Sequence, residues 1–124
     1  MAEIPVKALF DTNILVDYLN GVEASKQEIG RYPQRLVSIV TWMEVLVGAT
    51  DEAETDVLEM FMRDFRVVDL TRTIAREAVD LRRGRRIRLP DAIIWATANA
   101  ESALLITRNT RDFPADAPGV RVPY

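Results

Sequence analysis

Three acidic residues each lie alone in an apolar segment of this 124-residue sequence. They are Asp11, alone within residues 8–16, Glu44 within residues 36–50, and Asp91 within residues 89–100. Such segments are expected in a protein core, where an ionised carboxylate loses much of its hydration unless it is paired. Three acids in three separate core segments favour one shared explanation, which is a site that binds a cation.

The expected secondary structure places these acids at one edge of a sheet. Asp11 follows a strand and opens a helix, Glu44 lies in the first turn of a helix after another strand, and Asp91 opens a helix after Pro90. Asp112 follows a third strand closely, with Asn109 between. Ligands of open α/β sheets bind beyond the carboxyl ends of the strands. Four carboxylates meeting there would repel one another, and a divalent cation would relieve that repulsion.

The residue types restrict the cation. The sequence contains no histidine and no cysteine, which excludes disulfides and the commonest ligands of zinc and copper. Asp and Glu oxygens are typical ligands of hard cations, so the sequence predicts Mg²⁺ or Mn²⁺.

Each acid also has a structural alternative. Thr41 and Glu44 have the spacing of a capping box, with Thr41 at the N-cap and Glu44 at N3. Asp91 is favoured near a helix start by the helix dipole, and Asp11 would satisfy backbone donors in its turn. Asp17 is expected on a solvated helix face, without a role.

The pattern of apolar residues predicts alternating strands and helices. Strands are expected at 6–10, 35–40, 66–70, 103–107 and 120–122, and helices at 12–20, 22–31, 41–49, 51–64, 71–83 and 89–101. This alternation is typical of an α/β fold with a largely parallel central sheet and helices on both faces. The length suits one domain spanning residues 1–124.

Charge and hydropathy indicate the compartment. The net charge is −3, which by itself argues weakly against nucleic-acid binding. Residues 1–5 have neither the basic start nor the apolar core of a signal peptide, and no apolar run is long enough for a membrane span. We therefore expect a cytoplasmic protein without a membrane partner.

Four segments together resemble the motifs of the PIN-domain family. In chain order they are Phe10–Leu15 (FDTNIL), Thr41–Glu44 (TWME), Leu89–Ala98 (LPDAIIWATA) and Leu105–Phe113 (LITRNTRDF). Their order and spacing, and the short chain, are similar to VapC-type toxins of bacterial toxin–antitoxin pairs. One departure is Trp95, where the family usually has a small residue, and we expect it to alter packing behind the Asp91 helix.

The resemblance implies an Mg²⁺- or Mn²⁺-dependent ribonuclease that often forms homodimers and is blocked by a small antitoxin protein. It implies metal-binding and catalytic roles for Asp11, Glu44 and Asp91, with the fourth position left open between Asn109 and Asp112. Such an ion would polarise a phosphate oxygen and activate water. Thr12 and Asn13 are expected to orient Asp11 or to contact the RNA phosphate.

A run of five arginines precedes Asp91 between residues 82 and 88. Because an acidic pocket repels RNA and arginine matches phosphate geometry, we predict that Arg85 and Arg86 bind the RNA backbone. The alternative is a solvated, salt-bridged face between two helices.

Two other functions compete with the ribonuclease. A catalytically inactive PIN-like module would only bind a partner protein, although all four acidic motifs are present. A phosphatase that uses Asp11 as its nucleophile is disfavoured, because such enzymes usually have a second Asp two residues later, where this sequence has Asn13.

Overall fold

The computed structural model describes residues 6–124 and contains six helices and five strands within them. The strands are β1 (Lys7–Phe10), β2 (Gln34–Ser38), β3 (Arg66–Val68), β4 (Leu104–Ile106) and β5 (Val120–Arg121). The helices are α1 (Thr12–Leu19), α2 (Glu23–Gly30), α3 (Ile39–Val47), α4 (Glu52–Met62), α5 (Arg72–Gly84) and α6 (Leu89–Ala100). The expected absence of a signal peptide concerns residues 1–5, which lie outside the described part.

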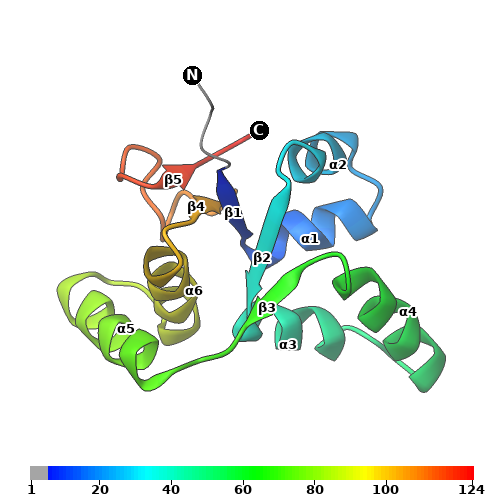
Figure 1. The fold of residues 1–124 in the computed structure, drawn as a ribbon, viewed down its shortest axis with the longest axis horizontal. Coiled ribbons are helices and arrows are strands. Elements are labelled where there is room, and N and C mark those ends of the chain that lie inside the picture. The colour runs from blue at the N-terminus through cyan, green and yellow to red at the C-terminus, as the bar shows by residue number, and fades with distance from the viewer. Residues whose placement is uncertain (1–5) are drawn as a thin grey trace.

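All five strands form one parallel sheet in the order β3-β2-β1-β4-β5 (Figure 1). Parallel neighbours require crossover connections, and helices supply most of them here. The central strand is β1, paired with β2 on one side and β4 on the other. This confirms the α/β fold with a parallel sheet.

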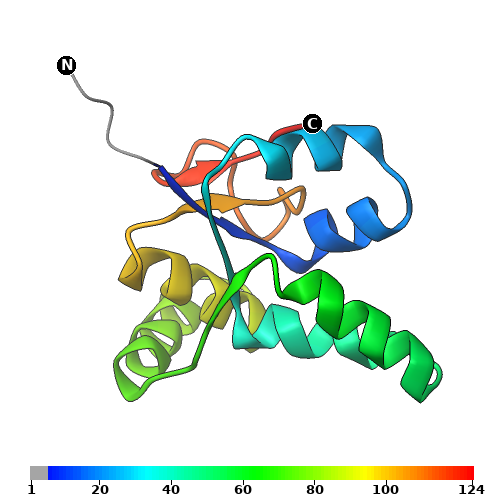
Figure 2. The same ribbon diagram turned by 45° about the vertical axis from the view of Figure 1, so that its right-hand side comes forward.

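Helices cover both faces of the sheet. Alternate side chains of β1 enter different cores: Leu9 packs with residues of α5 and α6, whereas Ala8 and Phe10 pack with residues of α1, α2 and α4. Figure 2 shows α5 and α6 together on one side of the strands and α1 and α2 on the other. Burial of both faces explains why the strands are nearly continuous apolar runs.

The boundary between β2 and α3 differs from the prediction. The strand was expected to reach Val40, but α3 already begins at Ile39, and Ser38 is its N-cap, accepting a hydrogen bond from the Val40 amide at 3.1 Å. The predicted capping box with Thr41 as N-cap is therefore wrong. Ile39 and Val40 favour strands by their β-branched side chains, but here they form the first helical turn.

Trp95 belongs to α6, the helix that carries Asp91, and packs into the core. Its side chain is buried and meets Phe113 edge to face, with 5.5 Å between ring centroids. The Arg85 guanidinium also lies against this indole, 4.6 Å from its centroid. Trp95 therefore joins α6 to the segment after β4 and to the α5–α6 connection.

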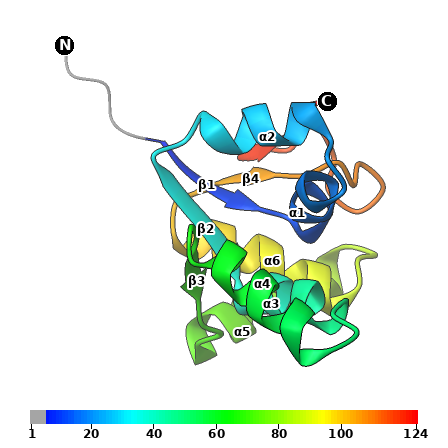
Figure 3. The same ribbon diagram turned by 90° about the vertical axis from the view of Figure 1, so that its right-hand side faces the viewer.

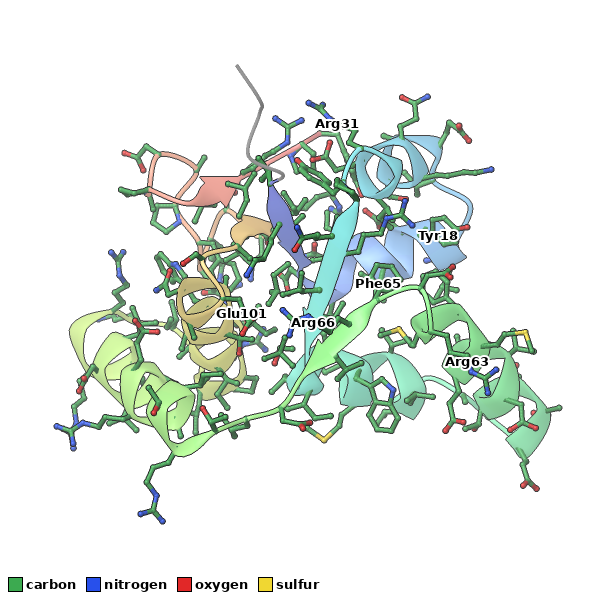
Figure 4. All side chains as sticks on the ribbon, viewed as in Figure 1. Tyr18, Arg31, Arg63, Phe65, Arg66 and Glu101 are labelled. Carbon is green, nitrogen blue, oxygen red and sulfur yellow. The ribbon has the colours of Figure 1, made fainter. Side chains whose placement is uncertain are left out.

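Two ion pairs tie distant elements together. Arg66 of β3 pairs with Glu101 after α6, and the two labelled side chains approach each other in Figure 4. Glu28 of α2 is 4% exposed and accepts two hydrogen bonds from Arg121 of β5, at 2.7 and 3.1 Å, and one from the Tyr32 hydroxyl at 2.8 Å. Arg121 thereby fastens the edge strand β5 to the helix layer.

Among residues 6–124, no helix has the length and hydropathy that crossing a bilayer would require.

Candidate active site

The predicted acids gather where β1 and β4 end. Figure 3 shows these two strands ending on the side where α1 begins and where the α5–α6 connection leads into α6. Asp11 comes directly after β1, and its amide donates to the Ile106 carbonyl at 2.9 Å. Asp91 lies in the first turn of α6. The carboxyl edge of the sheet therefore carries the candidate site, as the sequence predicts.

Asp11 is a buried carboxylate with three hydrogen-bond donors. Its oxygens accept from the Thr12 amide at 2.8 Å, the Asn13 side chain at 3.0 Å and the Thr107 hydroxyl at 2.7 Å. Burial raises the pKa of Asp11, and the charge of Glu44 adds to this, although the three hydrogen bonds favour the ionised form. The fold therefore fixes the carboxylate while leaving its negative charge only partly compensated.

Asp91 faces the same place from α6. Asp91 is buried, with 8% of its surface exposed. Burial raises its pKa to about 6, the charge of Asp11 adds to the increase, Arg88 opposes it, and Asp112 raises it further. Arg88 donates to Asp91 at 3.3 Å but is itself exposed, so it compensates the charge weakly. Two neighbouring carboxylates with raised pKa values are characteristic of functional sites.

Glu44 reaches the site from α3 and is exposed, which corrects its expected burial. Its Oε1 accepts a hydrogen bond from the Thr12 hydroxyl at 2.7 Å, and that hydroxyl lies 3.1 Å from the Thr41 hydroxyl. A buried Thr41 thus supports Thr12, and Thr12 supports Glu44. Thr12 and Asn13 both act on the acids in this structure, while a contact with RNA stays a prediction.

The sequence suggested that Asp17 lies on a solvated helix face, and the structure shows that this expectation is wrong. It accepts two hydrogen bonds from Arg108, at 2.5 and 3.0 Å, and one from the Tyr124 hydroxyl at 2.8 Å. Burial works against the charge of Asp17, but these hydrogen bonds outweigh it and lower its pKa. The Arg108 amide also donates to the Asn13 side chain at 3.2 Å. This cluster holds α1 against the segment that follows β4.

Asn109 and Asp112 bind each other. The Asn109 amide group donates to Asp112 at 2.9 Å, and the Asp112 backbone amide donates to the Asn109 oxygen at 3.3 Å. Asn109 lines the pocket with Asp11, whereas Asp112 acts on Asp91 through its charge. Both residues of the fourth motif are thus at the site, and which of them serves the chemistry stays open.

A pocket of about 310 Å³ lies between these groups. It is lined by Asp11, Thr12, Asn13, Val16, Asp17, Glu44, Arg88, Asp91, Arg108 and Asn109. Within residues 6–124, no three acidic side chains already surround one point as ligands of a single ion. Asp11 and Asp91 both line this pocket, and a carboxylate pair suits Mg²⁺ because that ion usually keeps several waters and takes one or two carboxylates.

The two arginines predicted to bind RNA are separated by the fold. Arg85 is held over Trp95. Arg86 instead lines a second depression beside the pocket, together with Arg88 and Asp112. Only Arg86 of the predicted pair therefore lies beside the acids.

Thr107, Asp17 and Arg108 are the site residues that the sequence did not indicate. Thr107 is buried and holds Asp11, and β1 and β4 pair Phe10 with Ile106, which sets the two following residues side by side. The pairing of the two strands was the missing information. The partners of Asp17 lie 91 and 107 residues away, beyond the reach of local patterns.

Comparisons with known proteins agree with this fold and site. The PIN domain profile matches residues 8–116. Ribonuclease VapC10 of Mycobacterium tuberculosis is 34% identical across 86% of this chain and 85% of that protein.

Solved structures give the same result. A toxin–antitoxin complex from Klebsiella pneumoniae contains a chain that is 44% identical, with a TM-score of 0.89 over 95% of this chain and 98% of that one. FitAcB from Neisseria gonorrhoeae is similar in fold alone, with 23% identity and a TM-score of 0.78 over 94% and 97% of the two chains. The sequence match over most of the chain and the parallel sheet with its acidic edge lead to one conclusion: this chain belongs to the PIN-domain family and is of the VapC type.

Proposed function

We propose that this protein is a metal-dependent ribonuclease and the toxin of a toxin–antitoxin pair. The observation that carries the proposal is the Asp11–Asp91 pair, two buried carboxylates with raised pKa values facing one polar pocket. A carboxylate pair of this kind is unfavourable in a folded protein unless a cation uses it. The similarity to Ribonuclease VapC10 supports RNA as the substrate.

The donor set fits Mg²⁺ or Mn²⁺. Carboxylate oxygens of Asp11 and Asp91 would hold the ion. The negative charges of Glu44 and Asp112, which act on these two residues, would add to the attraction. A bound divalent cation supplies the electrophilic charge that phosphodiester hydrolysis needs.

The other residues position these acids. Thr107, Thr12 and Asn13 fix Asp11, so its carboxylate cannot turn away from the pocket. Arg88 and Arg108 line the same pocket and place positive charge beside it, where an RNA phosphate must enter. The pocket therefore combines anionic groups for a cation with a cationic rim for the substrate.

The partner is an antitoxin protein. The Klebsiella pneumoniae chain that resembles this one along nearly its whole length belongs to a toxin–antitoxin complex. By this similarity, expression of the protein alone should inhibit growth, and co-expression of its antitoxin should relieve the inhibition.

The direct test is cleavage of a fluorescent single-stranded RNA by the purified protein. We expect cleavage with Mg²⁺ or Mn²⁺, loss of cleavage in excess EDTA, and recovery when the metal is added back. A preparation of Asp11→Asn controls for contaminating nuclease. Full activity in excess chelator, or equal activity from Asp11→Asn, would disprove the metal-dependent reaction at this site.

Glu44→Gln should separate charge from hydrogen bonding. The glutamine oxygen can still accept from Thr12, and Glu44 is exposed, so the fold should be unchanged. We expect cleavage to fall by about tenfold or more, since one negative charge near Asp11 is lost. Half-maximal activity should also require more Mg²⁺. The exposed Glu52→Gln on α4 is the matched control. Unchanged metal dependence in Glu44→Gln would restrict Glu44 to a structural role.

A further inference from the structure

A second depression, of about 410 Å³, adjoins the acidic pocket and is lined mainly by arginines. We call it the arginine groove, formed by Arg82, Arg86, Ile87, Arg88, Arg111 and Asp112. Its four guanidinium groups come from the end of α5, from the α5–α6 connection and from the segment after β4. Arginines from three separate segments therefore converge in one concave place.

The arginine groove is continuous with the acidic pocket. Arg88 lines both depressions. On the other side, Asn109 of the pocket is hydrogen-bonded to Asp112 of the groove. The two depressions are therefore adjacent on the surface of the protein.

The positive charge of the groove is largely uncompensated. Among residues 6–124, Arg82, Arg86 and Arg111 have no ion-pair partner within 4.0 Å, and Arg88 is paired with Asp91 at 3.3 Å. Asp112 is the one acid of the lining, and it already accepts a hydrogen bond from Asn109. Like charges gathered in a hollow repel one another, so the arrangement favours a polyanionic ligand.

The connection that carries these arginines is anchored. Ile87 is 5% exposed and belongs to the core beneath α5 and α6, so it fixes the backbone between Arg86 and Arg88. Arg85, one residue earlier, is held over Trp95 and lines a different depression with Glu77 and Asp80. Burial of Ile87 and stacking of Arg85 thus leave Arg86 and Arg88 to face the groove.

We propose that the arginine groove binds the RNA phosphates that flank the phosphate being cleaved, with Arg82, Arg86, Arg88 and Arg111 as its ligands. This inference rests on the proposed ribonuclease function. Guanidinium groups match phosphate oxygens in a bidentate manner, and the groove gathers four of them beside the pocket. The groove would hold the strand, while the acidic pocket performs the cleavage.

The test compares two double variants with the same change in charge. Arg86→Gln with Arg111→Gln removes two groove arginines from separate segments. Arg76→Gln with Arg83→Gln removes two exposed arginines of α5 that do not line the groove. Binding of a fluorescent 12-nucleotide single-stranded RNA is measured by anisotropy over a salt series in EDTA, which prevents cleavage.

We expect the groove variant to bind about tenfold or more weakly at 0.1 M salt. The plot of log affinity against log salt should become shallower by about 1.4, since each contact to single-stranded phosphate contributes about 0.7. The control variant should change affinity by less than twofold. Equal loss in both variants, or no loss in the groove variant, would overturn the proposal.

Cleavage of a dinucleotide in Mg²⁺ separates this inference from the proposed function. The dinucleotide lacks the flanking phosphates, so the groove variant should lose much less cleavage on the dinucleotide than on the longer RNA. If the wild type cleaves neither RNA, the proposed function fails. If the wild type cleaves both and the groove variant cleaves both equally well, only the groove assignment fails.

Discussion

Asp91→Asn should lower RNA cleavage by roughly 10²–10⁴-fold while making the metal-free protein more stable. The loss follows because a cation bound at the site contributes several kcal/mol to hydrolysis and this variant removes one of its two buried carboxylates. The gain follows because the asparagine side chain carries no charge to repel Asp11 and Asp112. We expect about 1–2 kcal/mol at pH 7, allowing for solvent screening of a pKa raised to about 6.

The pH dependence of stability should also differ between the wild type and Asp91→Asn. Folding raises the pKa of Asp91 above its ordinary value of 3.8, so between about pH 4 and pH 6 the folded protein binds more protons than the unfolded chain. Wild-type stability should therefore decrease as the pH rises through that window, and Asp91→Asn should show a smaller decrease.

Urea unfolding of both proteins in EDTA, from pH 4 to pH 7.5, measures this difference. Asp80→Asn on the exposed side of α5 is the control for loss of one carboxylate. A variant that is less stable than the wild type at pH 7 would contradict the idea that the charge of Asp91 destabilises the metal-free protein.

Arg121→Met should destabilise the protein by about 2–4 kcal/mol at pH 7. Arg121 donates two hydrogen bonds to the 4%-exposed Glu28, and removing one member of a buried pair leaves the other charge uncompensated. Methionine retains part of the apolar stem, so the loss reports mainly on charge. Arg31→Met is the matched control, because Arg31 is exposed and lies 3.7 Å from the same carboxylate; it should cost less than about 0.5 kcal/mol.

Low pH should reduce this penalty. Burial opposes the charge of Glu28, but hydrogen bonds from Arg121 and Tyr32 outweigh it and lower the pKa in the wild type. The pair therefore contributes stability above the ordinary pKa of 4.5, and that contribution is lost as the pH falls through the folded pKa. Chemical denaturation at pH 7 and pH 4 should show the two proteins converging. A difference that does not depend on pH would assign the effect to packing.

The sequence predicts the parts of the site that depend on local contrast. Asp11 and Asp91 are charged residues in apolar segments, and the structure buries both at the carboxyl edge of the sheet. Glu44 shows the limit of that reasoning, because its segment is apolar but one side of α3 faces out, leaving Glu44 exposed. The boundary between β2 and α3 could not be predicted from the sequence either, because no glycine or proline separates the two elements.

Contacts between distant segments lay beyond the sequence. Glu28 lies in a polar helix, and its main charge partner, Arg121, is 93 residues away. The five-arginine run was visible, but its division between Trp95 and the groove depends on how α5, α6 and the loop at Arg111 pack.

The central place of β1 has a consequence for how the molecule opens. β1 is paired on both sides, whereas β3 and β5 are the sheet's outer strands. Amide hydrogens of β1 should exchange with deuterium only through near-global opening, while those of the outer strands exchange through local fraying. Asp11 directly follows β1 and its amide bonds to Ile106 of β4. The carboxylate is thus attached to the most slowly exchanging part of the chain, and partial opening at the sheet margins leaves it in place.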